Sequence, residues 1–321
     1  MDLREFAADS KVKILIGKGG VGKTTVTCTL ARALAGAGLR VLIVELEGRP
    51  EVARSFGIHT ELSYEPEPLY VDPSGGLVSA RLLTSDEALL EYLDDHGLGR
   101  ISRRLLRSGV LDVVAGAIPG IRDVLVLGKI KQISNEQPVD VVLVDAPATG
   151  HAVTLLTSAA GLAEVARSGP VRHQAEAVVE MLSDPGRCSV LLVTLPEELP
   201  VSETIEAAFT VEDRAGVSLG PLICNLVDLA AASLAVPAGV AAAEAGIELD
   251  IQVITDLDQA AAFQRHRAAT ASSQLDRLRR ELPLPAVKLP RLAAASIGPA
   301  ELELLAHALA EGLERLPGGS T

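Results

Sequence analysis

Short, uninterrupted apolar runs recur along the chain and alternate with segments of helical periodicity. A continuous apolar run of about five residues is typical of a strand buried on both faces. We expect six such strands, at Val12–Ile16, Arg40–Leu46, Val139–Val144, Ser189–Leu195, Gly220–Leu226 and Ala286–Leu289. Helical patterns lie between or after them, notably at Lys23–Ala35, Ser202–Ala215 and Pro299–Leu316. The alternation predicts an α/β fold with a mostly parallel sheet covered by helices on both faces.

One stretch breaks this alternation. Residues 85–137 contain no convincing buried strand, and three helical patterns fill them, at Ser85–Leu93, Leu98–Val114 and Ile121–Ser134. We therefore predict a helical insertion at 85–137, with helices within 155–185 as candidates to join it. Residues 1–84 and 138–321 then form a single α/β domain.

The net charge of the chain argues against some classes of binding partner. The 321 residues include 29 basic and 42 acidic side chains, which gives a net charge of −13. Such a chain lacks the basic surface that nucleic acids and anionic lipids require. Aromatic residues make up only 2% of the sequence, too few for a base-stacking platform. We expect no nucleic-acid partner.

The start of the chain and its cysteines point to a reduced, aqueous compartment. The first ten residues lack the apolar core of a signal peptide, and no uncharged apolar run reaches the ~20 residues of a membrane-spanning helix. We predict a cytoplasmic protein without direct membrane insertion. Cys28, Cys188 and Cys224 stand far apart, which predicts buried thiols and no zinc site.

A glycine-rich segment, GKGGVGKTT at residues 17–25, follows the first predicted strand and precedes a helix. It fits the phosphate-binding pattern G-x-x-x-x-G-K-[ST] in the required context. Its backbone N–H groups, from Gly19, Gly20, Val21 and Gly22 onward, would cradle phosphate oxygens. Lys23 would neutralise the β- and γ-phosphates, Thr24 would hold Mg²⁺, and Thr25 would reach the α-phosphate. We predict a site for ATP or ADP with Mg²⁺.

Lys18 adds a second cation to this loop. A phosphate loop does not need a lysine at that position, and Lys23 would repel it unless an anion lies nearby. One interpretation is that Lys18 contacts a phosphate bound to another subunit, and the alternative is an ordinary solvated surface lysine.

Two carboxylates are candidates to complete the site. Asp145 follows the apolar run VDVVLV, so a strand would deliver it beside the phosphate loop, where it could bind Mg²⁺ directly or through water. The residues after it, 146–151, contain Pro and Gly and predict a non-helical turn that could change shape when the γ-phosphate leaves. Glu47, just after the second strand, could orient or deprotonate the attacking water. We therefore take Lys18, Lys23, Glu47 and Asp145 as the candidate catalytic residues.

Several of these motifs resemble those of one known family. The chain resembles the arsenite-pump and tail-anchored-protein-targeting ATPases, in the deviant Walker-A class, over nearly its whole length. The specific matches are GKGGVGKTT and the switch DAPATGH at 145–151. The resemblance implies a P-loop NTPase fold and a dimer in which Lys18 reaches the partner's nucleotide. It also implies adenine contacts from Asn225 and from Pro290, Arg291 and Leu292.

Three departures from the family pattern bear on function. Glu47-Gly48 stands where the family usually has Asp-Pro, so the carboxylate sits on a longer arm. The paired cysteines that bind zinc between targeting-factor subunits are absent, as is a thiol cluster for arsenite. The insertion contains no Met, although a Met-rich groove is the family's feature for transmembrane clients. Arg100, Arg103, Arg104 and Arg107 share one helical face, which is either a docking surface or a solvated face.

Three hypotheses follow for function. The first is a dimeric Mg-dependent ATPase whose nucleotide state switches a helical region that binds a protein client or partner. The second is a nucleotide-binding regulatory subunit of a heterodimer with a related ATPase, with weak hydrolysis of its own. The third is a positioning ATPase of the same class, against which the acidic helix at 299–316 counts. Homodimer and heterodimer both fit the sequence, and the client stays open.

Overall fold

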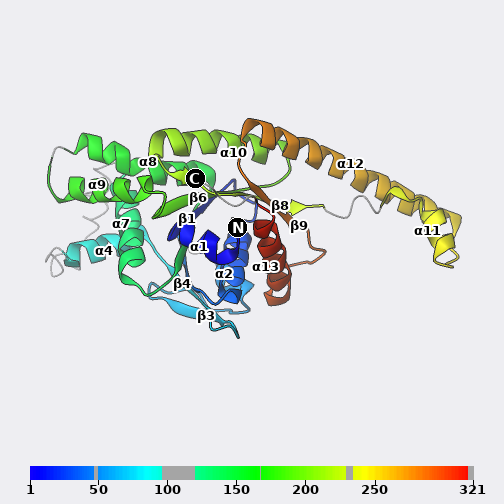
Figure 1. The fold of residues 1–321 in the computed structure, drawn as a ribbon, viewed down its shortest axis with the longest axis horizontal. Coiled ribbons are helices and arrows are strands. Elements are labelled where there is room, and N and C mark those ends of the chain that lie inside the picture. Colours follow the sequence, from blue (N-terminus) through cyan, green and yellow to red (C-terminus); the bar gives the residue numbers. More distant parts are fainter. Residues whose placement is uncertain (47–49, 96–119, 167, 229–233, 317–321) are drawn as a thin grey trace.

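The centre of the computed structural model is a nine-stranded sheet; the structure describes residues 1–46, 50–95, 120–166, 168–228 and 234–316 (Figure 1). The strand order is β3-β4-β2-β5-β1-β6-β8-β9, with β7 beside β6, and every pair except β3–β4 is parallel. The α/β fold with a mostly parallel sheet is confirmed. The strands are β1 (Val12–Ile16), β2 (Arg40–Glu45), β3 (Glu67–Val71), β4 (Leu77–Leu82), β5 (Val141–Asp145), β6 (Cys188–Thr194), β7 (Ser218–Leu219), β8 (Leu222–Val227) and β9 (Ala286–Pro290).

Helices cover both faces of this sheet, because successive strand residues point to opposite sides. Ile14 of β1 packs in one apolar core with α7, α8, α9 and α10, whereas Leu15 packs in a second core with α1, α2 and α13. The described helices are α1 (Leu3–Asp9), α2 (Lys23–Gly36), α3 (Glu51–Ser55), α4 (Ser85–Asp95), α7 (Ile121–Glu136), α8 (Thr149–Val165), α9 (Pro170–Ser183), α10 (Glu198–Thr210), α11 (Ala238–Glu244), α12 (Ile251–Glu281) and α13 (Pro299–Glu314), and a π-helical turn, η1 (Val211–Ala215), follows α10.

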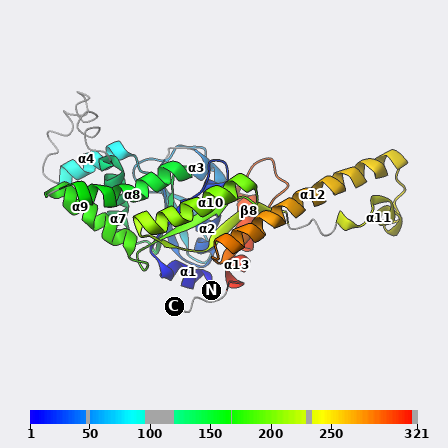
Figure 2. The same ribbon diagram turned by 90° about the horizontal axis from the view of Figure 1, so that it is seen from above.

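Two predicted helices differ from the structure or lie outside its described residues. The helix predicted at Ser202–Ala215 begins earlier, at Glu198, because a proline such as Pro200 is tolerated in the first helical turn. The helix predicted at Leu98–Val114 lies outside the described residues, as does the arginine face at 100–107. Helices α4, α7, α8 and α9 gather at one end of the molecule (Figures 1 and 2). The division into an α/β domain and an insertion stays a prediction.

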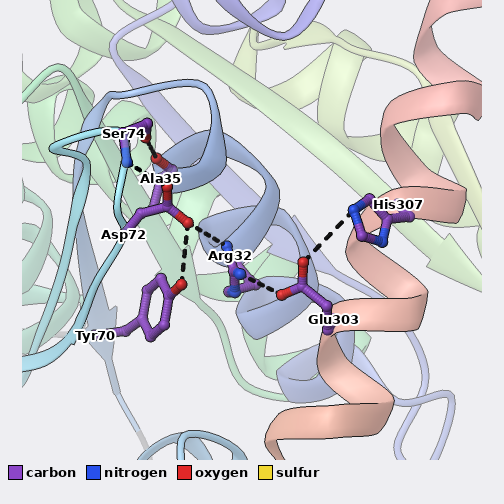
Figure 3. A network of polar contacts seen from close by, with 7 residues as sticks. All are labelled: Arg32, Ala35, Tyr70, Asp72, Ser74, Glu303 and His307. Atoms are coloured by element: carbon purple, nitrogen blue, oxygen red, sulfur yellow. Dashed lines mark hydrogen bonds and ion pairs between the residues drawn. The ribbon is translucent and has the colours of Figure 1, made fainter.

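The sequence prediction missed the hairpin β3–β4 at the edge of the sheet. A polar network holds it against α2 and α13 (Figure 3). Arg32 of α2 donates a hydrogen bond to Asp72 at 2.9 Å, forms an ion pair with Glu303 of α13, and lies 4.2 Å from the centre of the Tyr70 ring. Arg32 is largely buried, so these contacts fix the hairpin and α13 to the helix that follows the phosphate loop.

A long arm, also missed, projects from the body at the end opposite α4 and α9 (Figures 1 and 2). It runs from residue 234 through α11 into the 31-residue α12, and within α12 only Leu275 and Leu278 are buried. Seven of the twelve exposed large apolar residues in the described chain lie here: Val236, Val240, Ile247, Ile251, Val253, Leu257 and Phe263. Within the described residues, no helix combines the length and apolar character needed to cross a membrane.

Candidate nucleotide site

The phosphate loop joins the end of β1 to the start of α2, and its shape depends on glycine. Gly20 and Gly22 have φ angles of +87° and +85°, which side chains disfavour. A Cβ on Gly17 would lie 2.3 Å from the Val193 carbonyl oxygen of β6. Glycine at these positions therefore lets the loop turn directly into α2, whose first backbone N–H groups can bind an anion.

Lys23, the first residue of α2, lies back across the loop. Its Nζ donates to the Gly17 carbonyl oxygen at 3.1 Å and approaches that of Lys18 at 3.5 Å. The next residue, Thr24, donates from Oγ1 to Asp145 Oδ2 at 2.7 Å, and Thr27 Oγ1 lies 3.3 Å from Asp145 Oδ1. The structure thus brings together the cation, the hydroxyl and the carboxylate that the sequence singled out.

A cavity of about 230 Å³ opens at this point. Its lining comprises loop residues, the last residues of two strands and the start of α3: Gly20, Gly22, Lys23, Thr24, Thr25, Glu45, Glu51, Asp145 and Ala146. A hydroxyl and a carboxylate in contact are the hard oxygen ligands that Mg²⁺ prefers, with its other positions left to water and phosphate. Thr24 and Asp145 therefore fit a magnesium ion as its protein ligands.

The sequence analysis gave no role to the carboxylate of Glu45. Glu45 ends β2 beside Asp145 of β5 and is only 2% exposed. The signal was present, because the ends of adjacent parallel strands meet at one edge. Glu47, to which the role was given, lies outside the described residues.

Burial raises the pKa of the nearby Cys28 thiol well above its usual value, and the charges of Asp145 and Glu45 add to this, so Cys28 stays a thiol.

Lys18 points to a different partner. Its Nζ lies 2.7 Å from Glu203 Oε1 on α10, and both side chains are partly exposed. The anion near Lys18 thus comes from its own chain. The proposed contact with a second subunit's phosphate stays a prediction.

Asn225, within β8, supports the loop. Its Nδ2 donates to the Val21 carbonyl oxygen at 2.9 Å, and the side chain is 3% exposed. A Cβ on Gly22 would lie 2.5 Å from that Nδ2, which is a further reason for glycine there. Leu226, the following residue, has a positive φ of 55°. The expected adenine contact of Asn225 stays a prediction.

A second cavity, of about 220 Å³, is lined by residues from four segments that are far apart in sequence, and one of these segments includes Leu226, next to Asn225. Pro196, Leu226, Asp228 and Arg291 line it, together with residues of α12. Arg291 Nε lies 3.8 Å from an Asp228 carboxylate oxygen. Pro290 and Leu292 were also expected to contact adenine, but neither lines this cavity. Pro290 ends β9, and Leu292 packs against the apolar core.

The switch after β5 differs from the predicted turn. Residues 146–148 are non-helical, but α8 begins at Thr149 and includes Gly150 and His151. The prediction holds for residues 146–148 and was wrong for 149–151, because Pro147 precedes the helix, where it does not interrupt it, and Gly150 lies in the first turn, where its cost is small. The Thr149 N–H donates to the Gly17 carbonyl oxygen at 3.1 Å. The start of α8 is therefore bonded directly to the phosphate loop.

A mostly parallel sheet, a glycine loop between β1 and α2 and an acidic residue at the end of a neighbouring strand define a P-loop nucleotide-binding protein. The family model described as anion-transporting ATPase, ArsA, matches residues 10–168. Residues 10–168, which include the phosphate loop and the switch, belong to this family of ATPases, as the resemblance in sequence suggested. ATP is the nucleotide that such membership implies.

Individual relatives support the same assignment. ATPase BagA of Mycobacterium tuberculosis is 38% identical over 224 residues, covering 67% of this chain and 64% of BagA. Arsenical pump-driving ATPases of Escherichia coli and Acidiphilium multivorum are each 28% identical over 227 residues, covering 68% of this chain and 35% of each relative. The chain thus spans less than two thirds of the length of these relatives.

Proposed function

We propose that this chain binds Mg-ATP at the phosphate loop and hydrolyses it. The observation that carries the proposal is the contact of Thr24 with Asp145 at the mouth of the loop, beside Lys23. Two segments far apart in sequence, the loop with the start of α2 and the end of β5, supply there the groups that phosphoryl transfer requires: backbone donors, a cation and magnesium ligands.

The chemistry assigns a task to each group. A water oxygen forms a bond to the γ-phosphorus while the bond to the β–γ bridging oxygen breaks, which releases ADP and phosphate. The loop N–H groups and Lys23 stabilise the charge on the phosphate oxygens. Magnesium, held by Thr24 and Asp145, would neutralise further phosphate charge. The water is oriented by a carboxylate, for which the candidates are Glu47, on the sequence pattern alone, and the buried Glu45, which lines the cavity.

Nucleotide state would reach the helical region through α8. Its first residue, Thr149, donates a backbone hydrogen bond to the phosphate loop, and the rest of α8 packs against α7. Helices α7 and α8 pack in the same apolar core, to which Leu127 of α7 and Leu156 of α8 both contribute. A shift at the loop would therefore move α8 against α7, in the region assigned to a protein client or partner.

A dimer is part of this proposal, and the arm supports a protein partner. From residue 234 to 258 the arm has five acidic side chains and no Lys or Arg, whereas Arg265 and Arg267 follow on α12. An antiparallel arm from a second copy or a related chain would pair these opposite charges and cover the exposed apolar residues. Sedimentation with and without Mg-ATP tests this, and a monomer in both conditions would contradict it.

The second candidate is a nucleotide-binding regulatory subunit with weak hydrolysis. The observation in its favour is Glu47-Gly48, where the resembled family has Asp-Pro. Phosphate release by the chain alone and with a related ATPase separates the candidates. Turnover by the chain alone that depends on Mg²⁺ and Lys23 supports the first; tight ATP binding without turnover supports the second.

A further inference from the structure

The ion pair between Lys18 and Glu203 joins the phosphate loop to α10. The two residues are 185 positions apart in sequence, and their Nζ and Oε1 atoms lie 2.7 Å apart. They meet because β1, which precedes the loop, is paired with β6, which precedes α10. The parallel strands end at one edge and deliver both segments there.

The two lysines of the loop lie in different directions. Lys23 turns across the loop, to the carbonyl oxygens of Gly17 and Lys18. Lys18 instead extends to Glu203, outside the cavity that holds Lys23, Thr24 and Asp145. The carboxylate thereby balances the cation that Lys23 would otherwise repel.

The fold fixes the position of Glu203 independently of Lys18. Val201 and Thr204, on either side of it in α10, are buried, and Ser202 accepts a hydrogen bond of 3.0 Å from Arg277 of α12. The helix therefore presents the carboxylate at a set place. The side chains of Lys18 and Glu203 are 32% and 40% exposed, so water screens their attraction. Such a pair changes an equilibrium by a factor of about five or less.

We propose that Glu203 is a positioning residue, which holds Lys18 against its own chain until a phosphate group on a second subunit displaces the carboxylate. This rests on the proposed function, in which two chains associate, and on the prediction that Lys18 contacts a phosphate bound to the second chain. A nucleoside triphosphate carries several negative charges and Glu203 carries one. Lys18 is therefore attracted more strongly to the phosphate than to Glu203 once a second chain brings the nucleotide close. In its absence the carboxylate keeps Lys18 from other anions. Glu203 thus sets how readily ATP drives two chains together.

The first test examines the ion pair without nucleotide. Lysine acylation followed by mass spectrometry compares the rate at which Lys18 is modified in the parent, Glu203→Gln and Glu206→Gln. Glu206 is exposed on the same helix, so its variant removes an equal charge and serves as the control. We expect Lys18 to react about two- to fivefold faster in Glu203→Gln and at the parental rate in Glu206→Gln. Equal rates in all three would overturn the proposal.

The second test measures ATP-driven association by sedimentation. We expect Glu203→Gln to associate about two- to fivefold more tightly than the parent in Mg-ATP. In a Lys18→Ala background, Glu203→Gln should have no effect, whereas a merely structural role for Glu203 would persist there. An equal effect in both backgrounds, or weaker association in Glu203→Gln, would overturn the inference. If Lys18 reacts faster but ATP associates neither protein, the ion pair stands, and the proposed function fails together with the displacement.

Discussion

The hydroxyl of Thr24 donates a hydrogen bond to the carboxylate of Asp145 across 121 residues of sequence, at 2.7 Å. Thr24 is the second residue of α2 and Asp145 ends β5, so the contact follows from the pairing of β1 with β5, which places the phosphate loop beside the end of a neighbouring strand. It defines where magnesium would be held.

Thr24→Ala should weaken ATP binding in Mg²⁺ on the order of tenfold or more, because it removes a ligand and leaves the Asp145 carboxylate with one hydroxyl partner fewer. Binding measured in a chelator should change much less. Thr24→Ser keeps the hydroxyl and is the matched control. Calorimetry in both conditions checks this, and an equal loss in Mg²⁺ and in chelator would contradict the assignment of Thr24 to the metal.

The carboxylate that orients water is tested by comparing two glutamates. Glu47→Gln should lower turnover by about 10²-fold, within the range that positioned acid–base groups contribute. Glu47→Asp tests whether the longer side chain is a handicap, in which case turnover rises. Parental turnover in Glu47→Gln together with a large loss in Glu45→Gln would transfer the role to Glu45, which is buried beside Asp145.

Lys13 of β1 should make stability depend on pH. Its side chain is 1% exposed, and burial lowers its pKa to about 8, against a smaller opposite effect of Asp9. Between the unfolded pKa of about 10.5 and pH 8, the folded protein has lost a proton that the unfolded chain keeps. The free energy of unfolding is therefore highest above the unfolded pKa, where Lys13 is neutral in both states. It falls by roughly 3 kcal/mol as the pH drops toward 8, because the folded protein must then bury a charged Lys13.

Lys13→Met removes this cost but also a hydrogen bond to Ser10 and a contact with the Phe6 ring. We expect a gain of about 1–3 kcal/mol in unfolding free energy at pH 7. The gain should shrink by pH 10, as the parent is relieved of its buried charge. Urea unfolding at both pH values measures it, with Lys11→Met as the control. A gain that is equal at both pH values would contradict the pKa shift.

The sheet and its loop could be predicted because their signals are local. Five-residue apolar runs mark strands buried on both faces, and residues 17–25 specify the phosphate loop without reference to the rest of the chain. The hairpin β3–β4 was missed because an edge carries no such run. Its strands mix buried positions with half-buried or exposed ones and include Pro68 and the buried Arg81, which lies over the Tyr64 ring.

The remaining parts of the site depend on contacts between distant segments. No pattern near Glu203 in sequence marks it as the partner of Lys18, since only the pairing of β1 with β6 brings them together. The arm was missed for another reason. Over most of its length α12 has no core to face, so its apolar residues follow no buried helical stripe.

The most direct test of the account is phosphate release from Mg-ATP by the parent chain and by Lys23→Ala, with ATP binding measured by calorimetry on the same samples. Lys23 supplies the cation at the focus of the loop, and Lys18 is held by Glu203 outside the cavity. The account predicts that the parent binds and hydrolyses ATP in Mg²⁺, and that Lys23→Ala, folded as judged by its unfolding transition, does neither. Parental ATP binding in Lys23→Ala would contradict it.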